Sequence, residues 1–258
     1  DLHSFPTRRS SDLGNCSKYD WQFATHFTDE KFLKKAKKAG LEPAAASLLY
    51  QRGVQTEEAL QEFLEPSLDQ LHDPYDLHDM DRAVERIRSA IENYEQILIY
   101  GDYDADGMTS ASIVKEALDQ LGAECQVYLP NRFTDGYGPN SSVYKYFIEN
   151  HGISLIITVD NGVAGLEAIE LAQSLGVDVI VTDHHSMPEE LPNAYAIVHP
   201  EHSGADYPFK HLAGCGVAFK LATALLEEVQ VELLDLVAIG TVADMVSLTN
   251  YQDRKSVV

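Results

Sequence analysis

The sequence has little cysteine, no long hydrophobic run and few basic residues for its size. Its three cysteines, Cys16, Cys125 and Cys215, lie far apart and form no CxxC or Cys/His pattern, which argues against a disulfide framework and a structural zinc site. The most apolar runs, such as residues 154–159 and 178–182, are far shorter than the roughly 20 residues that span a bilayer. We therefore expect a cytoplasmic protein that neither crosses a membrane nor is exported.

Positive charge is scarce, because 19 Lys and Arg residues stand against 41 Asp and Glu residues and give a formal net charge of −22 at pH 7. Binding to nucleic acid depends largely on neutralising phosphates with Lys and Arg, so this balance argues against an extended nucleic-acid surface. Two considerations reduce the objection. A metal site is itself rich in carboxylates, and a basic surface can belong to a part of the protein outside this sequence.

The two ends of the sequence differ from the segment between them. Residues 1–15 have no initiating Met and no apolar periodicity, and we expect them to be non-native or disordered. The closing residues 253–258 complete no element, so the chain is expected to be a fragment cut at this end. Residues 31–93 carry apolar residues at helical spacing and predict a small helical segment before the main domain.

From residue 96 onward, short β-branched runs alternate with amphipathic helical patterns. This alternation is typical of βαβ units, and it predicts an α/β fold with a doubly wound, mainly parallel sheet over residues 94–250. The expected strands are residues 96–101, 125–130, 154–160, 178–185 and 194–200, and the expected helices are residues 110–122, 143–152 and 165–176. Ligands bind at the carboxyl ends of the strands in such sheets.

Acidic and imidazole side chains follow three of the expected strands. These are Asp102, Asp104 and Asp106 after the first, Asp160 after the third, and Asp183, His184 and His185 after the fourth, with Asp244 after a later apolar run as a further candidate. If the strands are parallel neighbours, these groups converge at one edge, where unpaired carboxylates repel each other unless cations lie between them.

The side chains at this edge predict the kind of metal. Carboxylates with one or two imidazoles suit Mn²⁺ or Mg²⁺, and two such ions can position a hydroxide nucleophile and a phosphoryl group. The sequence therefore predicts a two-metal site for phosphoester hydrolysis. Each residue alone has a second interpretation: the acids can be turn or capping residues, and His184 and His185 can be the start of a helix. The prediction of a metal site therefore depends on the occurrence of all of them at strand ends.

Two glycine-containing segments remain open to two interpretations. In residues 129–140, Arg132 precedes Gly136 and Gly138; the Arg can hold a phosphate with two hydrogen bonds, or the segment can be a solvated loop with turn glycines. In residues 211–220, the glycines either let the backbone approach a substrate or permit tight packing before a helix.

The motifs GDYDADG, VDNG, TDHH and GTVADMV, read in this order, resemble the four motifs of the DHH phosphoesterase superfamily. The longer strings YGDYDADGMTSASI, LPNRFTDGYG, VTDHHSMPEELPNAYAIVHP and AGCGVAFKLA are similar to the RecJ family of single-strand DNA exonucleases within it. Many members of the superfamily have His four residues before the first metal-binding Asp, where this chain has Tyr100. RecJ-type members share this departure, which points to an exonuclease rather than a pyrophosphatase.

The resemblance implies degradation of single-stranded DNA from the 5′ end to mononucleotides, in DNA repair and recombination, with two Mn²⁺ or Mg²⁺ ions. It implies single-stranded DNA as the partner, with a helicase and a single-strand-binding protein as further partners and no membrane. The implied metal ligands are Asp104, Asp106, Asp160, His184 and Asp244, and Asp160 would bridge the two ions. Asp102 would either support these ligands or be a further ligand. His185 and Arg132 would contact substrate phosphate, with Gly136 and Gly138 beside them, and Asp160, His184 and His185 would be the catalytic group.

RecJ proteins continue into a second DHH-associated domain and an OB-fold that grips single-stranded DNA, and the resemblance implies that both lie outside this chain. Two alternatives remain. One is a DHH-type phosphodiesterase for short oligonucleotides or cyclic dinucleotides, which dependence on substrate length would reveal. The other is a non-catalytic scaffold similar to Cdc45, which loss of metal ligands would mark.

Overall fold

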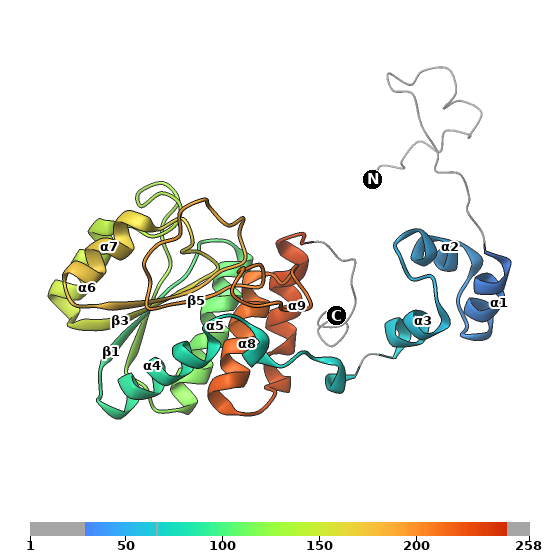
Figure 1. Cartoon of the computed structure of the whole chain (residues 1–258), viewed down its shortest axis with the longest axis horizontal. Helices are drawn as coiled ribbons and strands as arrows, with labels where there is room; N and C mark the ends of the chain where they lie inside the picture. The colour runs from blue at the N-terminus through green and yellow to red at the C-terminus, as the bar shows by residue number, and fades with distance from the viewer. Residues whose placement is uncertain (1–28, 66, 247–258) are drawn as a thin grey trace, which may run out of the picture. The chain divides into compact units, whose positions relative to one another are not determined.

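The computed structural model describes residues 29–65 and 67–246, and the chain divides between Glu57 and Glu58 into two compact units (Figure 1). Among the described residues, no helix combines the length and the apolar character that a membrane crossing requires. The predictions for residues 1–15 and 253–258 lie outside the described residues.

The first unit is helical. It contains α1 (Glu30–Lys38) and α2 (Pro43–Gln51), and α3 (Glu57–Leu64) begins at its boundary. The side chain of Asp29 caps α1 by accepting hydrogen bonds from the backbone N–H groups of Lys31 and Phe32. The rings of Phe32 and Tyr50 meet edge to face, with centroids 5.1 Å apart, and join α1 to α2.

The second unit contains a five-stranded parallel sheet in the order β2-β1-β3-β4-β5. The strands are β1 (Gln96–Tyr100), β2 (Cys125–Tyr128), β3 (Ile153–Val159), β4 (Asp178–Thr182) and β5 (Ala196–Val198). The prediction of an α/β, doubly wound, parallel sheet is confirmed. The strand order changes direction between β1 and β3, which is the position where ligands bind in doubly wound sheets.

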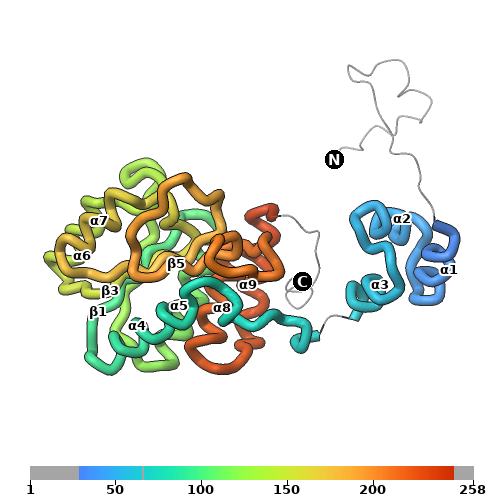
Figure 2. Tube along the Cα trace, in the orientation of Figure 1, coloured from blue at the N-terminus to red at the C-terminus, as the bar shows by residue number. Residues whose placement is uncertain are grey.

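Helices cover both faces of the sheet (Figures 1 and 2). One layer consists of α4 (Met80–Glu92), α5 (Ala105–Gln120), α8 (Gly214–Leu226) and α9 (Leu234–Ala243), and the other of α6 (Ser141–His151) and α7 (Leu166–Ser174). Short 3₁₀ turns occupy η2 (Leu68–Gln70), η3 (Pro74–Asp76) and η4 (Val231–Leu233).

Each central strand serves two cores because alternate side chains point to opposite faces. In β1, Ile97 and Ile99 belong to the core beneath α4, α5 and α8, whereas Leu98 and Tyr100 belong to the core beneath α6 and α7. This double burial explains why the strands are continuous apolar runs instead of alternating ones.

Helix α4 was expected in the helical segment before the main domain, and it lies in the second unit. Its residues Met80, Val84 and Ile87 are buried in the core that also contains Ile97 and Ile99 of β1. The domain boundary at residues 93 and 94 stays a prediction. Helix α5 begins at Ala105, five residues before the expected start at Ser110, because Asp104 caps it.

Candidate metal centre

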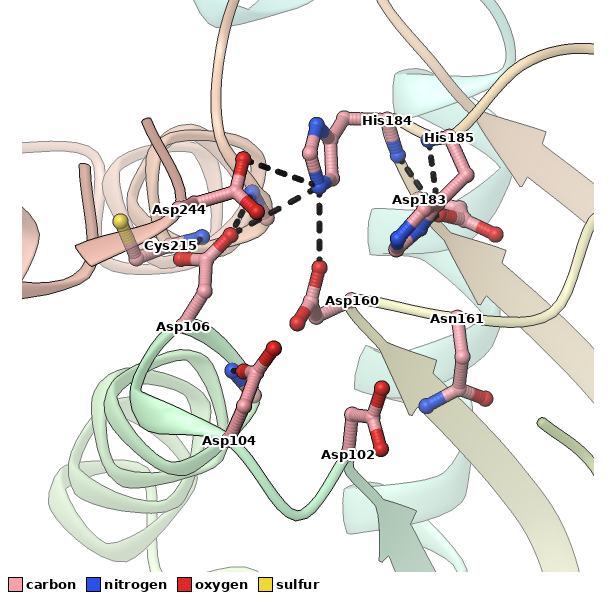
Figure 3. A network of polar contacts seen from close by, with 12 residues as sticks. Asp102, Asp104, Asp106, Asp160, Asn161, Asp183, His184, His185, Cys215 and Asp244 are labelled. Carbon is pink, nitrogen blue, oxygen red and sulfur yellow. Dashed lines mark hydrogen bonds and ion pairs between the residues drawn. The ribbon is translucent and has the colours of Figure 1, made fainter. Parts of the chain in front are cut away.

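The acidic and imidazole residues predicted from the strand ends do converge (Figure 3). The register pairs Tyr100 with Thr158, and Val159 with Thr182, so β1, β3 and β4 end at the same edge of the sheet. The segments that follow carry Asp102, Asp104 and Asp106, then Asp160, then Asp183, His184 and His185. Asp244 reaches the same place from the C-cap of α9 instead of from a strand.

The segment after β1 contributes three carboxylates in three different environments. Asp102 is 2% exposed and accepts a hydrogen bond from the backbone N–H of Tyr103 at 2.6 Å, and burial raises its pKa. Asp104 is exposed, and its Oδ1 caps α5 by accepting from the Gly107 N–H at 2.9 Å. The capping interpretation of Asp104 is therefore correct for one of its two carboxylate oxygens.

Asp106 is fixed by a helix that lies more than a hundred residues later in the sequence. Its Oδ2 accepts from the backbone N–H of Gly214 at 2.6 Å and its Oδ1 from that of Cys215 at 2.9 Å. These N–H groups belong to the first turn of α8, where backbone donors have no partner within the helix and favour negative charge. The start of α8 therefore orients a carboxylate that is only 1% exposed.

Asp160 follows β3 in a left-handed conformation, with φ of 60°, which Asp and Asn adopt more readily than other non-glycine residues. The turn is held by its neighbours: Thr158 Oγ1 donates to the carbonyl of Asn161 at 2.7 Å, and the Asn161 side-chain amide donates to the Val159 carbonyl at 2.9 Å. Burial, together with the charge of Asp106, raises the pKa of Asp160 to about 10.

Asp183 faces away from the other carboxylates and holds the histidine segment. Its Oδ1 accepts from the backbone N–H of His184 at 2.7 Å and from that of His185 at 3.1 Å, and its Oδ2 accepts from the Val163 N–H at 2.9 Å. The same Oδ1 lies 2.8 Å from His185 Nδ1 and raises the pKa of His185. Burial alone would raise the pKa of Asp183, but the hydrogen bonds and charge of His185, together with the Val163 N–H, outweigh burial and lower it.

His184 lies at the centre of the cluster. Its Nε2 is 3.1 Å from Asp160 Oδ1, 3.7 Å from Asp106 Oδ2 and 3.7 Å from Asp244 Oδ2 (Figure 3). Within the described chain, both Nε2 of His184 and Oδ1 of Asp160 are buried without a hydrogen-bond partner, despite their proximity. Buried polar atoms are nearly always satisfied, so two adjacent unsatisfied ones indicate a missing partner that both can bind.

The composition of the cluster fits a divalent cation. The cluster contains three sets of three residues, and within each set the ligand atoms lie within 4.8 Å of one another. They are Asp160, His184 and His185; Asp106, His184 and Asp244; and Asp102, Asp104 and Asp160. A cation removes the repulsion that raises carboxylate pKa values at the site, and oxygen ligands with an imidazole suit Mn²⁺ or Mg²⁺.

Two side chains of the predicted substrate loop, residues 129–140, contact residues of the cluster or of the segment that carries it. The guanidinium of Arg132 lies over the ring of Tyr103, 5.5 Å from its centroid, beside Asp102 and Asp104 in sequence. The ring of Tyr137, which the sequence analysis did not identify, meets that of His185 edge to face with centroids 5.9 Å apart.

The two glycines of this loop, Gly136 and Gly138, have φ of 81° and 75°. This conformation suits glycine and lets the loop turn. The carbonyl of Gly138 accepts from the Tyr100 hydroxyl at 3.0 Å, which anchors the loop to β1.

Glycines in α5, α8 and α9 allow the carboxylates to approach closely. An added Cβ would lie 2.5 Å from Asp160 Oδ1 at Gly214, 2.7 Å from Asp106 Oδ1 at Gly240, and 2.6 Å from Asp102 Cβ at Gly107. The glycines in residues 211–220 were open to two interpretations, an approach of the backbone to substrate or tight packing before a helix. At Gly214 the structure shows tight packing, and the group that it packs against is the Asp160 carboxylate.

A comparison with protein families matches residues 96–241 to the DHH family, N-terminal domain. Among curated proteins, the chain is 48% identical over 232 residues to the single-stranded-DNA-specific exonuclease RecJ of Bacillus subtilis, covering 90% of this chain and 29% of that protein. It is 40% identical over 227 residues to RecJ of Escherichia coli, covering 81% of this chain and 38% of that one. The chain thus spans about a third of the length of these relatives.

Solved structures give the same result. The chain resembles the exonuclease RecJ bound to manganese with a TM-score of 0.64 and 33% identity, over 70% of this chain and 46% of that one. It resembles RecJ of Thermus thermophilus in complex with Mn²⁺ with a TM-score of 0.66 and 30% identity, over 85% and 31%. Because the family match covers more than half of the chain and includes β1 to β5, the chain belongs to the DHH family.

Proposed function

We propose that this chain carries the catalytic centre of a single-strand-specific 5′-to-3′ DNA exonuclease that uses two Mn²⁺ or Mg²⁺ ions. The observation that carries the proposal is the pair of buried, unsatisfied atoms, Asp160 Oδ1 and His184 Nε2, surrounded by further carboxylates. The similarity to RecJ proteins supports the reaction and the substrate.

The proposed metal ligands are His184, the three carboxylates within 3.7 Å of its Nε2, and one further carboxylate that lies close to Asp160. They are Asp104, Asp106, Asp160, His184 and Asp244, with Asp160 shared between the two ions and Asp102 as a further ligand or a supporting residue. Two bound cations would lower the pKa of a water molecule and neutralise negative charge on the phosphoryl group. The free oxygen of Asp104 is available for this role because its other oxygen caps α5.

His185 has a different proposed role, at the substrate phosphate. Asp183 accepts at Nδ1 of His185 and favours its protonated form, so that Nε2 carries a proton that can be donated to a phosphate oxygen or to the leaving group. A protonated imidazole in this position would stabilise the negative charge of the transition state.

Arg132 is proposed to bind the phosphate near the 5′ end. Arg132 is exposed, and its guanidinium lies against the ring of Tyr103, the residue between Asp102 and Asp104. An Arg side chain can hold a phosphate with two parallel hydrogen bonds. Gly136 and Gly138 shape the loop that presents it. The net charge of −22 suits a metal centre but offers little affinity for DNA, so we propose that other parts of the protein supply most of the DNA affinity. We propose a helicase and a single-strand-binding protein as its protein partners.

The proposal is tested with a 5′-phosphorylated single-stranded oligonucleotide labelled at its 3′ end. We expect this chain with Mn²⁺ to shorten it from the 5′ end to mononucleotides, to leave duplex DNA intact and to stop when EDTA is added. His184→Ala should abolish the activity, whereas His151→Ala, which changes an exposed histidine on α6, should not. Cleavage limited to short oligonucleotides or cyclic dinucleotides, or no cleavage by a chain with bound metal, would contradict the exonuclease proposal.

A further inference from the structure

His199, which follows β5 directly, is a buried histidine outside the proposed ligand set. It is 1% exposed, and both of its ring nitrogens are engaged. Nε2 lies 2.8 Å from the backbone carbonyl oxygen of His185, and Nδ1 lies 3.0 Å from the backbone nitrogen of Glu201.

These two partners determine the protonation of the ring. The Glu201 backbone N–H can only donate, so Nδ1 of His199 must accept and carry no hydrogen. The His185 carbonyl can only accept, so Nε2 must carry the hydrogen and donate it. His199 is therefore the neutral tautomer protonated at Nε2, and its ring links the end of β5 to the backbone of His185.

This hydrogen bond completes a set of backbone restraints on residues 183–185. The Asp183 N–H donates to the Val198 carbonyl at 3.2 Å, and the N–H groups of His184 and His185 donate to Asp183 Oδ1. The carbonyl of His185 is held by His199. The end of β5 thus holds this segment at both of its ends, through Val198 at residue 183 and through His199 at residue 185.

We infer that His199 is a positioning residue for His185, holding its backbone so that the imidazole faces the substrate phosphate. The inference rests on the proposed function of His185. One hydrogen bond, from Nδ1 to Asp183, holds the ring of His185, and its other ring contacts are a tilted one with His184, with centroids 4.5 Å apart, and an edge-to-face one with Tyr137. A fixed backbone is therefore needed to keep its Nε2 in one place.

Two substitutions separate the two hydrogen bonds of His199. Gln reaches as far as Nε2, so His199→Gln keeps a donor for the His185 carbonyl, whereas Asn is shorter and His199→Asn keeps only an acceptor for the Glu201 N–H. If His199 acts through His185, His199→Gln should retain activity within about threefold, and His199→Asn should lose about 10- to 100-fold in kcat, the usual cost of removing such a supporting contact.

The experiment combines kinetics with NMR of chain labelled with ¹⁵N-histidine, without Mn²⁺. We expect His199→Asn to shift or broaden the ring signals of His185 and His199→Gln to leave them near those of the wild type. His199→Asn should also cause no further loss of kcat in a His185→Ala background, because the two residues act as one unit. If His199→Asn does not fold, His199→Met, which matches Gln in shape but has no donor, takes its place.

Equal His185 signals in the Gln and Asn variants, or the same loss of kcat with and without His185, would overturn the inference. The NMR result is independent of catalysis. A wild-type chain that cleaves no DNA but shows the expected difference between the two variants would therefore contradict the proposed function while supporting the positioning role of His199.

Discussion

Gly214 lies directly against Asp160: a Cβ added at Gly214 would be 2.5 Å from Asp160 Oδ1. We therefore expect Gly214→Ala to displace the Asp160 carboxylate or the start of α8, which also holds Asp106 through its N–H groups. Mn²⁺ binding should weaken at least tenfold, about 1.4 kcal/mol, in a calorimetric titration.

The matched control is Gly216→Ala, two residues further along the same helix. A Cβ there would first meet the flexible end of Leu212 at 3.0 Å, which can move aside. Both substitutions replace glycine by alanine in the first turn of α8, so their effects on helix propensity are similar and largely cancel in the comparison. Equal Mn²⁺ affinity of the two variants would show that the contact between Gly214 and Asp160 does not matter for the site.

A second prediction concerns an ion pair at the opposite edge of the sheet. Arg86 of α4 donates to Glu95 Oε2 at 2.6 Å and to Asp178 Oδ2 at 2.6 Å. The hydrogen bond from Arg86 lowers the pKa of Glu95, so its contribution to stability is present above the ordinary Glu pKa of about 4.3 and is lost as the pH falls through the lowered value. We expect Glu95→Gln to cost about 1 kcal/mol of unfolding free energy at pH 7 and less at pH 3, measured by urea denaturation.

Glu227→Gln provides the comparison for this ion pair. Glu227 accepts from Arg88 at the same 2.6 Å, but its side chain is 70% exposed, compared with 24% for Glu95. Exposed ion pairs contribute little, so its substitution should change the unfolding free energy by less than about 0.5 kcal/mol. A Glu95 variant as stable as the Glu227 variant at pH 7 would refute the role assigned to Arg86.

The third prediction tests the phosphate contact of Arg132. Arg132→Ala should raise KM for 5′-phosphorylated DNA about tenfold, which corresponds to the roughly 1.5 kcal/mol of a hydrogen bond to a charged group, and should lower the dependence of KM on salt. Arg132→Lys should recover part of the loss because Lys keeps the charge but not the paired donors. Arg88→Ala, on α4, is the control, and an effect of the same size there would indicate general electrostatics instead of a specific contact.

The sequence predicted the sheet well because its strands are buried on both faces. Runs such as residues 154–159 are mostly apolar and rich in β-branched residues, and in βαβ units such runs form parallel strands with aligned ends. The convergence of Asp106, Asp160 and His184 is expected from that alignment, and in the structure His184 Nε2 lies within 3.7 Å of both carboxylates. Their roles as metal ligands remain a prediction.

Other features of the site depend on contacts that local pattern does not reveal. Asp244 comes from the end of α9, and Asp106 is held by Gly214 and Cys215 across more than a hundred residues. Asp183 was recognised as a strand-end acid, but its hydrogen bonds turn it away from the cluster, toward the backbone of the histidine segment. A chain pattern specifies where an acid occurs, but not which way its carboxylate points.

We propose that Asp160 Oδ1 and His184 Nε2 are unsatisfied because they bind cations, and calorimetric titration of Mn²⁺ tests this most directly. We predict that the wild-type chain binds about two Mn²⁺ ions and that Asp160→Asn, which tolerates the left-handed conformation but lacks the charge, folds normally and binds at least tenfold more weakly. A folded wild-type chain that binds no Mn²⁺, or an Asp160→Asn variant with unchanged affinity and stoichiometry, would contradict the account.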